Sequence, residues 1–128
     1  MAPLLKSIEG VTIWSSDHHR LAEWYQQIFK LKKVQELAIP YDHAIALATE
    51  EGDLLLWIGE HSEVEGRNKD PFRIMISYFI DDVQKMESHL KEHNVEIIAG
   101  PAESPDGSMF FLTARDPEKN LIQLFQMK

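Results

Sequence analysis

Apolar side chains follow two spacings along the chain, one typical of strands and one typical of helices. Residues 5–14 alternate and are rich in β-branched side chains, which predicts a strand. Ser15, Ser16 and Asp17 then offer oxygens that can cap a helix, and the apolar residues that follow recur at helical spacing and predict a helix ending near Leu31. Three short apolar runs then predict strands over residues 34–39, 43–49 and 54–58.

The same order begins again in the second half. Residues 72–80 predict a strand, Asp81 and Asp82 can cap a second helix, and Asn94 predicts its end because asparagine tolerates the left-handed conformation. Three more strands are predicted over residues 95–99, 108–114 and 120–127, with Gly100 and Pro101 ending the first of them. The chain therefore reads βαβββ twice, and an internal repeat constrains a fold more than any single strand does.

The two repeats, about residues 5–59 and 72–127, are joined by a polar connector over residues 59–71. Each helix can cover only one face of its four-stranded sheet, so the other face needs a second layer. We therefore expect a single domain over residues 1–128, of the α+β class. Its two βαβββ modules are expected to form a curved eight-stranded mixed sheet around a cleft, with the helices outside.

Composition narrows the function classes. The chain has 128 residues, 44% of them hydrophobic, and no cysteine, which excludes a disulfide framework and a thiol nucleophile. We expect a cytoplasmic protein, because no apolar run is long enough to span a membrane or to resemble a signal peptide. The formal net charge of −8 argues against a nucleic-acid partner and is compatible with a cationic small molecule.

Several segments resemble one family. Residues 115–124, which read Arg-Asp-Pro-Glu-Lys-Asn-Leu-Ile-Gln-Leu, resemble the C-terminal signature of the vicinal-oxygen-chelate (VOC) superfamily, the glyoxalase, bleomycin resistance protein and extradiol dioxygenase group. Trp24 and Tyr25, followed by Leu31, look like the pattern of that family's first helix. Residues 79–83 resemble its entry into the second helix. The resemblance implies a cleft for a small molecule and a homodimer, in which the apolar start at residues 1–5 would be buried at an interface.

In the metal-dependent members of that superfamily, four strands each supply one ligand, usually His or Glu. The matching positions here fall on Gly10, on Leu56 or Trp57, on Met75 and on Gln123. None of these is a usual ligand for a divalent metal, so we expect no cofactor, and a metal at an atypical site is the alternative.

The six histidines do not rebuild such a site. His18 and His19 begin the first predicted helix and are expected in solvent. His89 and His93 have chelating i,i+4 spacing, but they stand near a helix C-terminus, where the helix dipole favours histidine for structural reasons.

Strand alternation assigns the lining of the expected cleft, starting from the family's ligand positions. His43, at the start of a strand, is included, and the fourth strand contributes Leu56 or Trp57 and the seventh Phe110 or Phe111. The candidate ligand-binding residues are Thr12, Trp14, His43, Trp57, Met75, Ser77, Phe79, Phe111, Gln123 and Phe125.

This aromatic lining predicts a metal-free binder of an aromatic or cationic small molecule. Two alternatives remain open at this point: a metal-dependent lyase, isomerase or dioxygenase of the same superfamily, and a non-catalytic interaction module. No catalytic residue can be assigned from the sequence.

Overall fold

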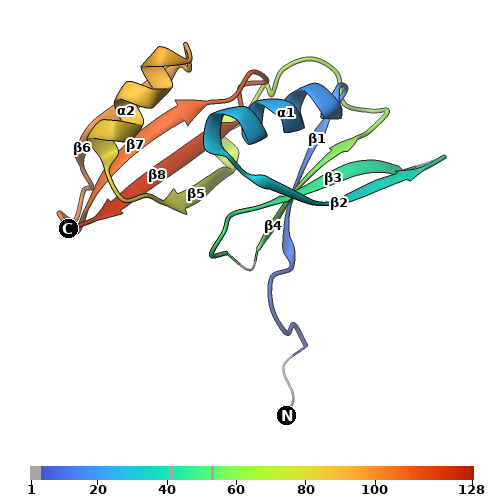
Figure 1. Cartoon of the computed structure of the whole chain (residues 1–128), viewed down its shortest axis with the longest axis horizontal. Coiled ribbons are helices and arrows are strands. Elements are labelled where there is room, and N and C mark those ends of the chain that lie inside the picture. The colour runs from blue at the N-terminus through green and yellow to red at the C-terminus, as the bar shows by residue number, and fades with distance from the viewer. Residues whose placement is uncertain (1–3, 41, 53) are drawn as a thin grey trace. The chain divides into compact units, whose positions relative to one another are not determined.

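The computed structural model describes residues 4–40, 42–52 and 54–128. Within them the predicted βαβββ order occurs twice, in two compact units, Met1–Gly66 and Arg67–Lys128 (Figure 1). The first unit contains β1 Gly10–Ser15, α1 His18–Phe29, β2 Lys32–Ile39, β3 Asp42–Ala48 and β4 Leu55–Glu60. The second contains a 3-10 turn Pro71–Arg73, β5 Met75–Phe79, α2 Val83–Glu92, β6 Ile97–Glu103, β7 Met109–Arg115 and β8 Leu121–Met127.

Each unit has one four-stranded mixed sheet, and the two sheets have the same topology. The strand orders are β1-β4-β3-β2 and β5-β8-β7-β6. The first strand of each unit pairs in parallel with the last, while the remaining pairs are antiparallel. The α+β class and the doubled module are therefore as the repeat in the sequence predicted.

Helix α1 covers one face of the first sheet. Asp17 caps it, because its side chain accepts a hydrogen bond from the Arg20 amide at 3.3 Å. Leu21, Ala22, Tyr25 and Ile28 recur at helical spacing and are all buried. The helix ends at Lys30, which has a left-handed φ of 57°.

Helix α2 is built in the same way. One carboxylate oxygen of Asp82 accepts hydrogen bonds from the amides of Gln84 and Lys85, both at 3.0 Å. The first helical amide, that of Val83, donates to Oε1 of Gln126 on β8 at 2.8 Å, which shows that Gln126 and its alternate neighbours face α2. Asn94 adopts φ of 57°, as predicted for the end of this helix.

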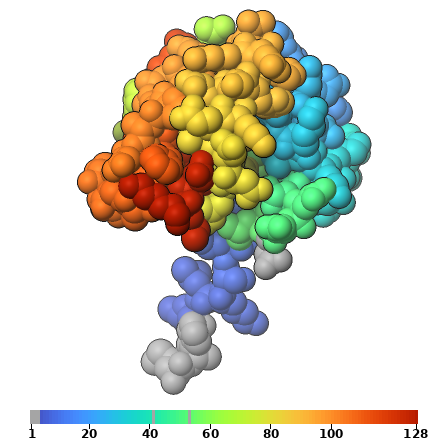
Figure 2. All heavy atoms as spheres, turned by 60° about the vertical axis from the view of Figure 1, so that its left-hand side comes forward, coloured from blue at the N-terminus to red at the C-terminus, as the bar shows by residue number. Residues whose placement is uncertain are grey.

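Two strands are shorter than their apolar patterns predicted. The first strand was expected from Leu5 but begins at Gly10, and Leu4, Leu5 and Ile8 are 98%, 88% and 70% exposed. These residues find no partner strand within the first unit, and the blue segment in Figure 2 extends away from the packed atoms. The strand expected over residues 72–80 loses its first residues to the 3-10 turn, because proline at position 71 favours a helical start.

Strand β6 is longer than predicted. It was expected to end at Gly100 and Pro101, yet it continues through them to Glu103. The ladder with β7 shifts register between Ala99 and Ala102, and β6 lies at the sheet edge, where the missing proline amide is tolerated. The other strands differ from prediction by one or two residues at their ends, including β4, which takes in Gly59 and Glu60 from the expected connector.

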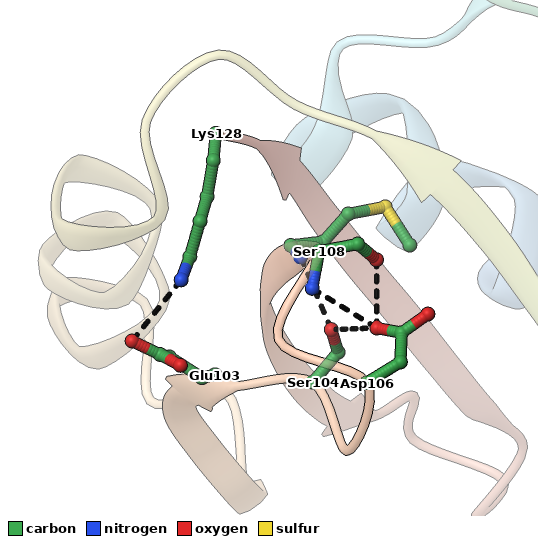
Figure 3. Close-up of polar contacts among 6 residues, drawn as sticks. Glu103, Ser104, Asp106, Ser108 and Lys128 are labelled. Atoms are coloured by element: carbon green, nitrogen blue, oxygen red, sulfur yellow. Dashed lines mark hydrogen bonds and ion pairs between the residues drawn. The ribbon is translucent and has the colours of Figure 1, made fainter.

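The turn between β6 and β7 is held by one carboxylate (Figure 3). Oδ1 of Asp106 accepts from the Ser104 hydroxyl at 2.9 Å, the Ser108 amide at 3.0 Å and the Ser108 hydroxyl at 2.7 Å. These bonds stabilise the ionised form and lower the pKa of Asp106 to about 2. Beside them, the Lys128 ammonium pairs with Glu103 at 3.1 Å.

Neither α1 nor α2, the helices within the described residues, has the length and apolarity needed to cross a membrane.

Candidate functional site

The face of the first sheet that α1 leaves uncovered carries two tryptophans. Register pairs Thr12 with Trp57 on the β1–β4 ladder, and Ala46 on β3 pairs with the other side of Trp57. Because side chains alternate along each strand, Trp14 lies on the same face, while Ile13, Ile45 and Leu56 turn toward α1. The choice between Leu56 and Trp57 is thereby settled, since Leu56 is buried and Trp57 lies on the helix-free face.

This face is hollowed. The hollow has a volume of about 230 Å³ and is open on one side. Its lining combines aromatic walls, small residues on the floor and two carboxylates: Glu9, Thr12, Trp14, Leu37, Asp42, Ala44 and Trp57. Concave surfaces with an apolar lining and few polar groups are where small molecules bind.

One carboxylate fixes the position of Trp57. The indole Nε1–H donates to both oxygens of Glu9, at 3.2 and 3.0 Å. Glu9 stands just before β1, and its carbonyl accepts from the Leu55 amide at 3.1 Å, which ties it to the start of β4. These hydrogen bonds hold the indole ring in one orientation.

The second tryptophan lies across a glycine. Trp14 pairs with Gly59 in the ladder, and a Cβ atom at Gly59 would lie 2.7 Å from Cζ3 of Trp14. The missing side chain leaves room for the part of the indole that carries Cζ3 and Cε3. His61 packs against the same ring edge-on, with centroids 5.2 Å apart, and Trp14 remains 41% exposed.

The charges at the hollow are negative. Glu9 and Asp42 contribute carboxylates, and no basic side chain is among the described residues that line the hollow. Carboxylates beside exposed indole faces form an environment that stabilises an organic cation through charge attraction and cation–π contacts.

In the second unit, the remaining predicted residues also share one helix-free face. The β5–β8 and β7–β8 registers align them in two rows across the sheet, one polar and one aromatic. The polar row is Ser77, Gln123 and Thr113, and the aromatic row is Phe79, Phe125 and Phe111. Met75 precedes them on β5 and is 37% exposed, and Phe79 is 74% exposed.

The structure does not place His43 on the helix-free face of the first sheet. It was expected to face the cleft, but β3 begins one residue earlier than predicted, and Asp42 and Ala44 take the helix-free face. The His43 ring instead stacks 6.0 Å from that of His18 at the start of α1, and its Nδ1 lies 3.3 Å from Oε2 of Glu60.

The expectation that His18 is solvated is also wrong. Its side chain packs under the start of α1 and is only 6% exposed, whereas the adjacent His19 is exposed. Burial, followed by the neighbouring His19, lowers the pKa of His18 below its ordinary value.

The four family ligand positions offer poor donors for a divalent metal. In the first unit, a side chain at Gly10 would collide with the carbonyl oxygen of Leu55, and the Trp57 indole already donates to Glu9. In the second unit, Met75 offers a thioether and Gln123 one neutral amide. These residues do not fit the family's metal, and no cluster of three or more potential ligands occurs within residues 4–40, 42–52 and 54–128.

Sequence reasoning missed four residues of the hollow: Glu9, Leu37, Asp42 and Ala44. Leu37 and Asp42 follow from alternation once the register of β2 on β3 is known, because Leu37 pairs with Ala44. Glu9 lay inside the predicted strand over residues 5–14, but β1 begins at Gly10, so alternation does not hold at Glu9 and does not locate it.

The fold is that of the proteins built from paired βαβββ modules. Residues 7–124 match the family described as Glyoxalase/Bleomycin resistance protein/Dioxygenase superfamily. The chain belongs to this superfamily. No curated protein sequence matches it.

Solved structures with this fold are distant in sequence. One is TnmS3, an antibiotic binding protein from Streptomyces sp. CB03234, with 17% identity over 99% of this chain and 100% of that one, and a TM-score of 0.80. A superfamily member from Sphaerobacter thermophilus has 17% identity over 97% and 99% of the two chains, with a TM-score of 0.81. A glyoxalase I mutant from Zea mays has 19% identity over 93% of this chain and 44% of that one, with a TM-score of 0.74.

Proposed function

We propose that the protein binds a small molecule, without a metal, and that the first unit's hollow recognises a flat apolar group bearing a positive charge. The observation that carries the proposal is the pair of indoles, Trp14 and Trp57, beside Glu9 and Asp42. A free tryptophan surface is costly to leave in water, and here one ring is held ready by a carboxylate.

The superfamily's solved members support a binding role. The name of TnmS3 describes it as an antibiotic binding protein, and that protein shares this fold. The poor donors at the family ligand positions favour binding over metal-dependent catalysis, as argued above.

Tryptophan fluorescence tests the proposal. Titration with benzyltrimethylammonium should change the emission, whereas its neutral isostere neopentylbenzene and the anion benzoate should bind about fivefold to thirtyfold more weakly. A cation–π contact and two nearby carboxylates supply about 1–2 kcal/mol of such preference, and 1.4 kcal/mol corresponds to tenfold.

Three variants assign the signal. Trp14→Phe and Trp57→Phe should each weaken binding, while Trp24→Phe, on α1 and packed against Tyr25 with ring centroids 4.9 Å apart, serves as the matched control. Equal affinity for the cation, its neutral isostere and the anion would contradict the charge preference. Loss of binding only in the Trp24 variant would place the site elsewhere.

Elemental analysis tests the metal-free part. The dialysed protein should retain less than one-tenth equivalent of zinc, nickel, iron or manganese. A stoichiometric metal would contradict it.

A further inference from the structure

A cluster of histidines lies where the start of α1 meets β3, on the side of the first sheet opposite the hollow. The rings of His18 and His19 are 4.2 Å apart, and His43 stacks on His18 at 6.0 Å with 29° between the planes. We call His18, His19 and His43 the histidine cluster.

On β3 and β4, residues at the cluster and residues at the hollow are next to each other in sequence. On β3, His43 belongs to the cluster, while its neighbours Asp42 and Ala44 line the hollow. On β4, Glu60 pairs with His43, and the preceding Gly59 lies beneath Trp14.

Strand β1 also connects the hollow to the histidine cluster. Trp14 lines the hollow, and the next residue, Ser15, is fully buried and accepts a hydrogen bond from the Asp17 amide through its hydroxyl at 2.9 Å. Asp17 is the cap of α1, the helix that begins with His18. A displacement of the helix start or of His43 therefore reaches the hollow through one residue on each strand.

Burial and the two neighbouring imidazoles oppose a positive charge on His18 and lower its pKa, while the carboxylates of Glu60 and Asp17 act in the other direction. Facing His18 are Asp17 and His19 from α1, His43 from β3 and Glu60 from β4. Glu36 of β2 lies within electrostatic reach and is paired with Lys33 at 2.8 Å. The positive end of the α1 dipole also disfavours a cation at its first residue.

We propose that protonation of the histidine cluster opens the start of α1 away from β3 and β4 and weakens cation binding in the hollow. His43 is half-exposed, and its Nδ1 lies 3.3 Å from Oε2 of Glu60. A proton on the buried His18 meets burial, two neighbouring imidazoles and the helix dipole, which together outweigh the attraction of Glu60 and Asp17, so the packed arrangement loses stability relative to an opened one. Thermodynamic linkage requires the reciprocal effect, in which a cation bound in the hollow lowers the proton affinity of the histidine cluster.

The ligand part of this inference rests on the proposed function, but its structural part does not. The structural test follows the indole N–H resonance of Trp14 by NMR between pH 5.5 and 8 in the ligand-free protein, above the range where carboxylates titrate. Because the His61 ring touches Trp14, every sample carries His61→Gln.

The Trp14 resonance should move with the midpoint of the His18 and His43 imidazole signals. The added substitution His43→Gln should remove most of the movement, and His18→Asn, if it folds by circular dichroism, should do the same. His93→Gln, which changes an exposed histidine at the end of α2, should leave the movement intact. A resonance that stays fixed, or that moves equally with His43→Gln, overturns the inference.

The ligand arm measures the Kd of benzyltrimethylammonium at pH 8 and pH 5.5. It should rise about fivefold or more, the lower end of typical coupling between sites, and less than twofold with His43→Gln. No binding at either pH overturns the proposed function while the NMR result stands on its own. An unchanged Kd with a moving Trp14 overturns the coupling.

Discussion

At the scale of single residues, the hollow depends on what is missing at Gly59. Its absent side chain makes room for the Trp14 ring, and its neighbour across β3, Ala44, is also small. Small residues on the floor and large rings on the walls give the depth of the hollow. The shape of the hollow thus requires small side chains on the floor as much as aromatic rings on the walls.

Gly59→Ala should displace the Trp14 indole, because the new methyl group would lie 2.7 Å from Cζ3. We expect a change in tryptophan emission and about a tenfold loss of benzyltrimethylammonium affinity, with a stability loss of about 1–3 kcal/mol from overpacking. Fluorescence titration and urea unfolding measure both. Gly107→Ala, at a positive φ of 75° in the second unit, is the control, and it should lower stability without changing affinity. Unchanged affinity in Gly59→Ala would contradict the role of the floor.

The sequence pattern predicted some residues of the site and missed others. Thr12, Trp14 and Trp57 were predicted from alternation and line the hollow. His43 was expected to face the cleft, but Asp42 and Ala44 on either side of it line the hollow, and alternation therefore turns His43 to the α1 side. Glu9 acts from outside the strand through a hydrogen bond 48 positions away in sequence, which no local pattern encodes.

At the scale of elements, two turns carry the clearest energetic consequences. The β7–β8 turn resembles the family's glycine-containing turn, but Lys119 occupies it with φ of 67°. The buried Asp116 holds this turn by accepting from the amides of Glu118 and Asn120 at 2.8 and 3.0 Å.

Lys119→Gly should raise the free energy of unfolding by up to about 1 kcal/mol. Left-handed backbone costs an L residue about 1–2 kcal/mol, and the greater chain entropy of unfolded glycine offsets about half of the gain. The midpoint of urea unfolding should rise at constant m-value. Asn94→Gly is the matched comparison and should change little, since asparagine already tolerates its φ of 57°. A lower midpoint for Lys119→Gly would show that the lysine side chain stabilises the turn.

Asp106→Asn should remove part of the acid sensitivity. The pKa of Asp106 falls from 3.8 to about 2 in the folded chain, so its ionised form contributes stability above pH 3.8 that is lost as the pH falls toward 2. The variant should be less stable at pH 6 and should lose less stability between pH 4 and pH 2. Thermal unfolding across this range is the measurement, and parallel curves for both proteins would contradict the assignment.

The order of the elements was predictable, and their limits were less so. Helix ends have local chemical causes: Asp17 and Asp82 were among the capping side chains that the sequence offered, and Asn94 was the predicted end of the second helix. The true start of β1 and the continuation of β6 past Pro101 depend on which strand pairs with which, and that is a tertiary property.

At the scale of the whole molecule, the exposed apolar segment before β1 bears on oligomeric state. Leu4, Leu5 and Ile8 have no cover within the described residues of the first unit. The superfamily resemblance implies a homodimer in which such a segment is buried.

We expect light scattering to give twice the chain mass of 14.8 kDa, and removal of residues 1–7 to weaken the dimer. The double substitution Leu4→Ser and Leu5→Ser tests the apolar contribution without shortening the chain. A mass of 14.8 kDa at all protein concentrations would rule out a stable dimer, and a dimer that is unaffected by both changes would rule out the segment as its interface.

The identical strand orders of the two sheets have an evolutionary meaning. They are what duplication and fusion of one ancestral βαβββ gene would leave, with each copy keeping its own helix, cap and core. The two helix-free faces differ in chemistry, with tryptophan and carboxylate on one and phenylalanine, serine and glutamine on the other. Because each copy's core lies beneath its own helix, selection can alter one binding face without refolding the other. A lineage can thus acquire a new ligand by changing half of an old gene.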